Sequence, residues 1–215
     1  MIMREKAYTL IRDAITFGDL RPGEKLVEAD LCERFMIGRT PLREAVRQLQ
    51  AEGYLDVIPN KGSTIRRISI AETEQVYDLL IILESYAVEE ATEKLQKKDI
   101  KNLYKINAEF KKSAITRNHK KWIRMNTQFH ACLWKASGNI VLVDEIERLR
   151  NKIYRSRGLI GTFTEHTDSY LNEHEQIMSM IEKKDPVKAS EAMKAHLRAR
   201  KKIVVDFLRE NLKLY

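Results

Sequence analysis

The segment from Ile37 to Leu49, IGRTPLREAVRQL, constrains the fold more than any other part of the chain. Folded as a helix, it would bring three apolar residues onto one face: Leu42, Val46 and Leu49. Its arginines recur every four residues and would line a different face: Arg39, Arg43 and Arg47. A planar guanidinium can make two-point contacts with phosphate oxygens or with the edge of guanine. The segment therefore predicts either a helix that reads a DNA groove or a surface helix whose arginines are solvated.

The residues before this segment favour the DNA-reading alternative. Apolar periodicity predicts one helix from about Arg4 to Phe17, ended by Gly18, and a second from about Glu28 to Met36. A short break separates the second helix from the arginine-bearing one. This order of helix, short turn and helix is typical of the helix-turn-helix motif.

The residues after the segment predict a basic hairpin. Leu55–Ile58 and Thr64–Ile68 have the composition of strands, and the residues between them have the composition of a tight turn. A hairpin directly after a reading helix is a wing, which could place Lys61 and the backbone of Gly62 against phosphate or the minor groove.

The composition agrees with a nucleic-acid partner. A formal net charge of +8 favours a polyanion, and an aromatic content of 7% favours duplex over single-stranded nucleic acid. Cys32 and Cys132 lie far apart in apolar-periodic segments, so we expect reduced thiols. No apolar run approaches the roughly 18 residues that suggest a membrane helix. We therefore expect a cytoplasmic protein that does not contact membranes.

Turn-forming residues divide the chain. Most glycines and prolines precede residue 70, and long helix-period sequence follows it. We therefore expect a mainly α fold with two domains: a winged helix-turn-helix at residues 1–70 and an all-α bundle of about six helices at residues 71–215.

The helix boundaries in the second half follow from local signals. The first helix is expected at Ala71–Lys94, with its inward residues at Val76, Leu79, Leu80 and Leu83. Asp99 is expected to be the N-cap of the second helix, and Asp185 the N-cap of the last, followed by Pro186 in its first turn.

Histidines in the helical half have the residue types of a metal site. Asn126 and His130 lie four residues apart on one expected helix, and His174 and His196 lie on the apolar sides of two later ones. Imidazole nitrogens commonly bind zinc and related ions, and facing helices of a bundle can bring ligands together. Each histidine taken alone is more often a satisfied core residue, and the sequence does not show whether the three converge.

Residues 31–62, LCERFMIGRTPLREAVRQLQAEGYLDVIPNKG, resemble the winged helix-turn-helix of GntR-family bacterial transcription regulators. The resemblance implies that the start of the reading helix contacts bases and phosphates and that the wing tip lies near Gly62. With the rest of the arginine edge and the wing, the expected DNA-contacting residues are Arg39, Thr40, Arg43, Arg47, Lys61 and Gly62. Gly38 departs from the pattern, because a serine or threonine often stands there and can cap the helix or contact phosphate.

The segments NTQFH (126–130), SGN (137–139), NEH (172–174) and AMKAHL (192–197) are similar to the FCD ligand-binding domain of the FadR-type branch of that family. There, three histidines and a carboxylate four residues before the first bind a divalent metal beside a small effector. The resemblance implies a zinc or nickel-like ion held by Asn126, His130, His174 and His196. Asn126 stands where aspartate is commoner, so the ion would lose a balancing charge.

A second departure concerns an arginine that many relatives carry just before Glu84, where this chain has Leu80 and Ile81. Arg150 and Arg155 could replace it in holding an effector, although we expect both to be solvated helix charges. The basic run from Lys194 to Lys202 is likewise expected to be a solvated face.

These features predict a homodimeric, DNA-binding transcription regulator. The resemblance implies, more specifically, a repressor relieved by an organic acid bound beside the metal. Its two reading helices would enter successive major grooves of a near-palindromic operator. One alternative is the same regulator with a metal-free pocket lined by neutral histidines. Another is a metal-dependent enzyme using the three histidines, although no glutamate base stands at HExxH spacing.

Overall fold

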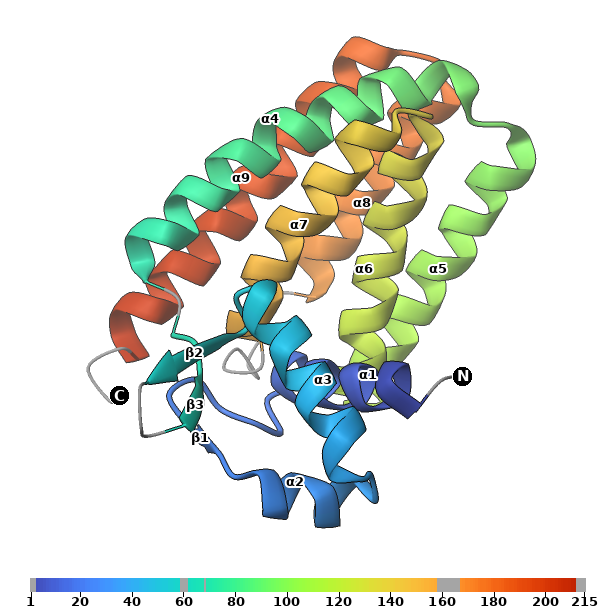
Figure 1. Ribbon diagram of the computed structural model, residues 1–215. Coiled ribbons are helices and arrows are strands. Elements are labelled where there is room, and N and C mark those ends of the chain that lie inside the picture. The colour runs from blue at the N-terminus through green and yellow to red at the C-terminus, as the bar shows by residue number, and fades with distance from the viewer. Residues whose placement is uncertain (1–2, 59–61, 68, 158–166, 212–215) are drawn as a thin grey trace. The chain divides into compact units, whose positions relative to one another are not determined.

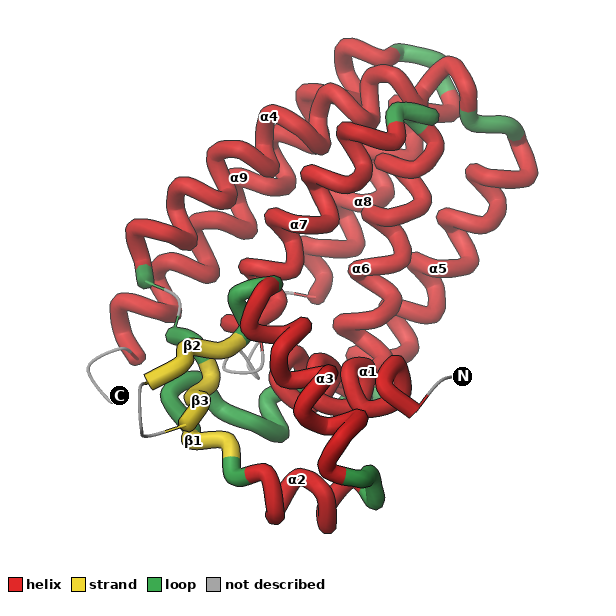
Figure 2. The backbone as a smooth tube through the Cα atoms, in the orientation of Figure 1, coloured by secondary structure: helices red, strands yellow, loops and turns green. Residues whose placement is uncertain are grey.

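The structure is a computed structural model that describes residues 3–58, 62–67, 69–157 and 167–211. It divides into two compact units. One unit groups Met1–Ser69 with Asn151–Ile160, and the other groups Ile70–Arg150 with Gly161–Tyr215. Most of the described chain is helical (Figure 2), so the expectation of a mainly α protein is confirmed.

The first unit combines helices with a small antiparallel sheet (Figure 1). Its elements are α1 (Met3–Thr16), β1 (Lys25–Leu26), α2 (Glu28–Phe35), α3 (Arg39–Ala51), β2 (Leu55–Ile58) and β3 (Gly62–Ile65). The strand order is β1-β3-β2, with Asp56 opposite Thr64 in the β2–β3 pair. The β2–β3 hairpin is the expected wing, and residues 59–61 of its turn lie outside the described residues. The sequence did not predict β1, because two residues are too few to carry a periodic pattern.

The reading helix α3 is fixed by its buried stripe. Leu42, Ala45 and Leu49 are fully buried, whereas Val46 is only half-buried. The expected stripe is therefore confirmed at Leu42 and Leu49, and Ala45 is its third fully buried residue in place of Val46. Gly38 is the N-cap in an extended conformation, and no side chain caps this end of the helix.

The second unit is a bundle of long helices (Figure 1). Its described helices are α4 (Ile70–Lys94), α5 (Lys97–Ile115), α6 (His119–Ala136), α7 (Ile140–Arg157), α8 (Thr167–Glu182) and α9 (Pro186–Asn211). The last residues of α7, from Asn151, are grouped with the first unit. The expectation of about six helices is confirmed among the described residues. Helices α4 and α9 lie side by side over much of their length.

Two expected helix caps have different outcomes. The Asp185 carboxylate accepts a hydrogen bond from the Lys188 backbone at 3.0 Å, so the expected N-cap of α9 is confirmed. The prediction for Asp99 is wrong, because Gln96 is the N-cap of α5 and Asp99 occupies the third helical position. Asp99 accepts from the Gln96 backbone at 2.9 Å and closes a capping box, so it still stabilises this end of the helix.

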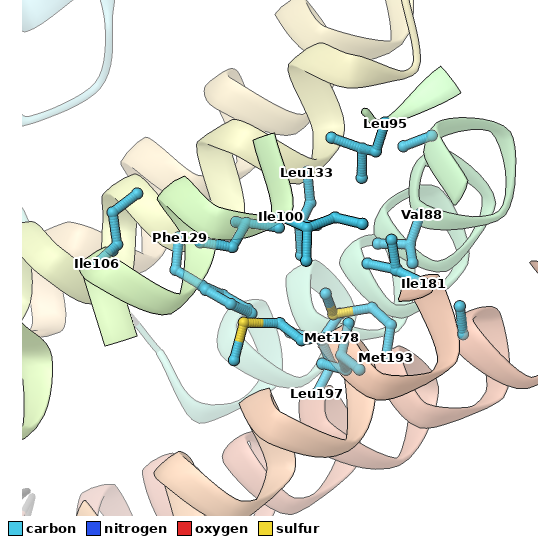
Figure 3. Close-up of a cluster of buried hydrophobic side chains, with 14 of the residues drawn as sticks. Val88, Leu95, Ile100, Ile106, Phe129, Leu133, Met178, Ile181, Met193 and Leu197 are labelled. Carbon is cyan, nitrogen blue, oxygen red and sulfur yellow. The ribbon is translucent and has the colours of Figure 1, made fainter. Parts of the chain in front are cut away.

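Apolar side chains from several helices form the core of the bundle. Phe129 and Leu133 of α6 face Met178 of α8 and Met193 of α9 (Figure 3). The expectation that Leu79 points inward is wrong, because its side chain is 49% exposed. The buried stripe of α4 repeats through Val76, Leu80 and Val88, and Leu79 lies about a quarter-turn away from it.

The described residues contain neither a disulfide nor a membrane-spanning helix. Cys32 and Cys132 are half-buried free thiols, in agreement with the expectation. None of the helices is both long and apolar enough to cross a membrane.

Candidate functional site

The outer face of α3 carries the residues expected to contact DNA. Arg39, Arg43 and Arg47 follow one another at intervals of four residues, and all three side chains are exposed. Thr40 is exposed beside Arg39. Because the opposite side of α3 is anchored by its buried stripe, this arginine edge is held towards solvent.

Arg43 already has an acidic partner within the first unit. Its Nε atom donates to Glu28 of α2, with 2.9 Å between Nε and Oε2. Both side chains are largely exposed, and an exposed pair of this kind is worth about 0–1 kcal/mol. Glu28 was not singled out in the sequence, since no local pattern places α2 against the start of α3.

The wing is joined to the reading helix, and a basic residue of the neighbouring strand β1 lies beside it. Gln50 of α3 donates a hydrogen bond to Ser63 Oγ of β3 at 2.7 Å. Gly62 opens β3 with a φ of 91°, a left-handed conformation that glycine adopts without strain. Lys25 is exposed on β1, and its Cε lies 3.8 Å from where a Cβ on Gly62 would stand. Lys61 lies outside the described residues. Lys25, which was not singled out in the sequence, is a basic side chain that the structure places next to the wing.

The bundle brings together the three histidines singled out in the sequence. His130 comes from α6, His174 from α8 and His196 from α9, and each side chain is almost completely buried. One ligand nitrogen from each lies within 4.8 Å of the other two. The Nε2 atoms of His130 and His196 are 3.2 Å apart. Helix spacing predicts which face each histidine occupies, but only tertiary packing brings the three faces together.

An oxygen atom from a neighbouring side chain holds the Nδ1 atom of each histidine. The pairs are His130 with Glu84 at 3.0 Å, His196 with Glu173 at 2.7 Å, and His174 with Asn107 at 3.1 Å. An ionised carboxylate can only accept, so it fixes the proton of its histidine on Nδ1. Each neutral ring then presents the lone pair of Nε2 to the centre of the cluster.

The charges around Glu173 support this assignment of protons. Burial alone would raise the pKa of Glu173, but hydrogen bonds from His196 and Ser169 bring it below its ordinary value. Burial lowers the pKa of His196, and the neighbouring Glu173 opposes that change only in part. Burial also lowers the pKa of His174 well below its ordinary value. Neutral imidazoles are therefore favoured at His174 and His196, and an ionised carboxylate at Glu173.

The Nε2 lone pairs of the three histidines can together bind a cation. Two Nε2 lone pairs at 3.2 Å repel unless a proton or metal ion lies between them. The Nε2 atom of His174 is buried and has no hydrogen-bond partner among the described residues. Three neutral imidazoles whose outer nitrogens are held by acceptors form a donor set that suits zinc and related divalent ions. The residues present therefore fit a divalent metal.

Asn126 offers an oxygen atom one helical turn before His130. Its side chain is 2% exposed, and Oδ1 has no hydrogen-bond partner among the residues that the structure describes. A buried carbonyl oxygen that lacks a donor is costly. Asn126 therefore fits a neutral oxygen ligand beside the three imidazoles.

The expectation that Arg150 is a solvated helix charge is wrong. Its side chain is 5% exposed, and it forms a buried ion pair with the Glu84 carboxylate through Nε and Nη2. Glu84 also accepts from His130, so the arginine balances the charge of the carboxylate that orients a histidine. The side chain of Arg155 lies outside the described part of the structure.

The basic run from Lys194 to Lys202 is only partly a solvated face. Arg198 and Lys202 are exposed, but Arg200 is buried. The Nη2 atom of Arg200 donates to Glu173 Oε1 at 2.9 Å, and the guanidinium lies 3.7 Å from the ring centre of Tyr170. The expectation is wrong at Arg200, because the apolar side of α9 also carries His196 one turn earlier.

Sequence reasoning missed the acceptors that orient the histidines. For Glu84 a signal was present: Leu80, Glu84 and Val88 recur every four residues along the buried stripe of α4. A carboxylate on a buried stripe needs a partner, which makes it a candidate for a site. Asn107 and Glu173 gave no comparable signal, since polar residues are common at the edge of a helical stripe.

The architecture defines a DNA-binding protein of the winged-helix class with an additional helical domain. Residues 3–65 match the family described as bacterial regulatory proteins, gntR family, and residues 75–199 match the FCD domain. The chain belongs to the GntR family of transcription regulators, and its FCD domain fits the FadR-type branch. It is therefore a DNA-binding transcription regulator and not an enzyme. Some FCD domains bind metals, in agreement with the three converging histidines.

Relatives match the chain over most of its length. The HTH-type transcriptional regulator YdhC of Bacillus subtilis is 28% identical over 190 residues, covering 88% of this chain and 85% of YdhC. The HTH-type transcriptional repressor RspR of Escherichia coli is 24% identical over 210 residues, covering 97% of this chain and 92% of RspR. The solved structure of E. coli McbR/YncC has a TM-score of 0.84 at 18% identity, covering 96% of this chain and 98% of that one, and so shares the fold.

Proposed function

We propose that the protein is a homodimeric repressor that binds a near-palindromic operator in the bacterial cytoplasm. A two-fold dimer demands a two-fold site, with the two reading helices in successive major grooves. The proposed DNA contacts are Arg39, Thr40, Arg43, Arg47, Lys61 and Gly62. Repression is supported by the similarity to RspR, whose name describes a repressor.

The two functions are assigned to the two parts of the chain. Residues 1–70 form the DNA-binding domain, and residues 71–215 form the domain for effector binding and dimerisation. The matches of residues 3–65 and 75–199 to two separate families support this assignment.

The helical domain holds one divalent metal, zinc or nickel-like, through His130, His174, His196 and Asn126. The observation that carries this proposal is the convergence of three buried histidines with Nδ1 held by acceptors. The ion would supply a Lewis-acidic centre to which an anionic effector can bind. Glu84 and Glu173 orient the imidazoles, and Arg150 balances the charge of Glu84.

An organic acid bound beside the metal controls the affinity for DNA. It can do so only if it binds the DNA-bound and DNA-free states of the dimer with different affinities. Relief of repression then follows from tighter binding of the acid to the DNA-free state. The FCD domain, which implies a small-molecule effector, supports this step.

Metal content measured after dialysis tests the proposed site. Purified full-length protein is loaded with zinc, dialysed and analysed by mass spectrometry of the metal. We expect about one ion per chain in the wild type and almost none in a His130→Ala/His174→Ala variant. A His119→Ala variant is the control, because His119 is exposed at the start of α6. Full metal content in the double variant would exclude the site, and a metal-free wild type would favour a pocket of neutral histidines.

A further inference from the structure

Arg200 is a buried cation that uses only part of its hydrogen-bonding capacity. Its side chain is 5% exposed, and Nη2 donates to Glu173 Oε1 at 2.9 Å and to Ser169 Oγ at 3.2 Å. The Nε and Nη1 atoms are buried and have no hydrogen-bond partner among the described residues. Together they carry three of the five N–H donors of a guanidinium.

The aromatic ring beside Arg200 does not satisfy these donors. The guanidinium carbon lies 3.7 Å from the ring centre of Tyr170, which places the ring against the flat face of the cation. The N–H bonds of a guanidinium point outward in its own plane, away from such a ring. The contact with Tyr170 therefore orients Arg200 and leaves its remaining donors available.

Arg200 is connected to the histidine cluster through one carboxylate. Glu173 accepts from Arg200 on Oε1 and from His196 on Oε2. Among the described residues, His174, Asn126 and Arg200 each have a buried polar atom without a hydrogen-bond partner, and these atoms are of two kinds. Nε2 of His174 and Oδ1 of Asn126 are acceptors, whereas Nε and Nη1 of Arg200 are donors. A metal ion satisfies the first kind, and an anion satisfies the second.

We infer that Arg200 binds the carboxylate of the effector, beside the metal. The inference rests on the proposed effector function, which it extends by naming the group that recognises the anion. Leu80 and Ile81 of α4 are buried and apolar, so neither can pair with an anion. Arg150 is engaged with Glu84 through Nε and Nη2. Of the two buried arginines in the helical domain, Arg200 is the one with unsatisfied donors among the described residues.

Binding of acetate, a small carboxylate probe, tests the inference in solution. Acetate is titrated into zinc-loaded, full-length protein labelled with 15N-arginine, and the Nε–H resonances of the arginines are followed. We expect the Arg200 signal, identified by its absence from Arg200→Gln, to shift with saturation. Arg200→Gln should bind acetate about 10- to 100-fold more weakly, since it loses a hydrogen-bonding cation. Acetamide, which has the same shape and no charge, should not compete.

The controls separate this inference from the metal site. Arg198→Gln removes an exposed charge from the same helix and should leave the affinity for acetate unchanged. Zinc affinity is measured on each variant by competition with a chelator, and acetate is also titrated into metal-free protein. Equal acetate binding by wild type and Arg200→Gln, with zinc retained in both, would overturn the role of Arg200 and leave the metal site standing. If Arg200→Gln does not fold, the Nε–H signal of Arg200 is assigned with Arg200→Lys, and the titration of the wild type is decisive. The inference is refuted if this signal does not shift when acetate is added to saturation.

Discussion

Replacement of Asn126 by aspartate should tighten metal binding, because it adds one negative charge at the proposed oxygen ligand. At an effective dielectric constant of about 20, a unit charge and a divalent ion about 2.1 Å apart attract by about 16 kcal/mol. Desolvation of a nearly buried carboxylate removes most of this gain. We expect a net gain of about 1.4–2.8 kcal/mol, which is 10- to 100-fold in affinity.

The same substitution should destabilise the metal-free protein. Asn126 Oδ1 is buried and has no hydrogen-bond donor among the described residues, so burial would raise the pKa of a carboxyl group at this position and disfavour its charged form. The melting temperature of metal-free Asn126→Asp should therefore fall below that of the wild type, and the increase on adding zinc should be larger. The chosen assays are competition with a chromophoric zinc chelator and thermal unfolding with and without zinc.

Two further variants make this prediction decisive. Asn126→Ala removes the oxygen and should weaken zinc binding, whereas Asn102→Asp adds the same charge at an exposed position of α5 and should change nothing. Equal zinc affinity in Asn126→Asp, Asn126→Ala and the wild type would show that position 126 is not a ligand.

Three other predictions concern the reading helix and the carboxylate beside His130. Arg43→Ala should lower the affinity for operator duplexes selected from a random library by several-fold or more, without changing the melting temperature of the protein. An unchanged DNA affinity in fluorescence anisotropy titrations would exclude a contact between Arg43 and DNA. Glu28→Gln should raise DNA affinity about two- to fivefold at low salt, because it frees Arg43 from its partner, and weaker binding would contradict this. Glu84→Gln should weaken zinc binding about 10- to 100-fold. Because it also uncouples buried Arg150, it should lower the free energy of unfolding by about 3–5 kcal/mol in urea titrations, and unchanged values of both would refute the role of Glu84.

The fold was largely predictable from the sequence because its signals are local and repeated. The spacing of Leu42 and Leu49 defined the buried side of α3, and the same spacing therefore defined its arginine edge. Long helices repeat their apolar pattern over several turns, so their existence was clear even where a single position such as Leu79 was assigned to the wrong face. The N-cap of α5 was predicted at Asp99, three residues after the true N-cap, Gln96, because Asp is favoured both at the N-cap and in the first turn of a helix.

The histidines of the candidate site could be predicted from the sequence, whereas the buried charged residues around them could not. Residue types and a family resemblance were enough to select His130, His174 and His196. Their Nδ1 acceptors come from other helices or from the edge of a stripe, and helix periodicity says nothing about which helices face one another. Arg150 and Arg200 were taken for solvated charges, since arginine is seldom buried unless a carboxylate pairs with it.

Anomalous X-ray diffraction at the zinc absorption edge, from crystals of zinc-loaded full-length protein, tests the central claim most directly. We predict one strong peak per chain in the helical domain, about 2.0–2.1 Å from the Nε2 atoms of His130, His174 and His196. The oxygen of Asn126 should lie at a similar distance from the same peak. A peak bound elsewhere, or the absence of a peak among the three histidines in protein that has been saturated with zinc, would contradict the account.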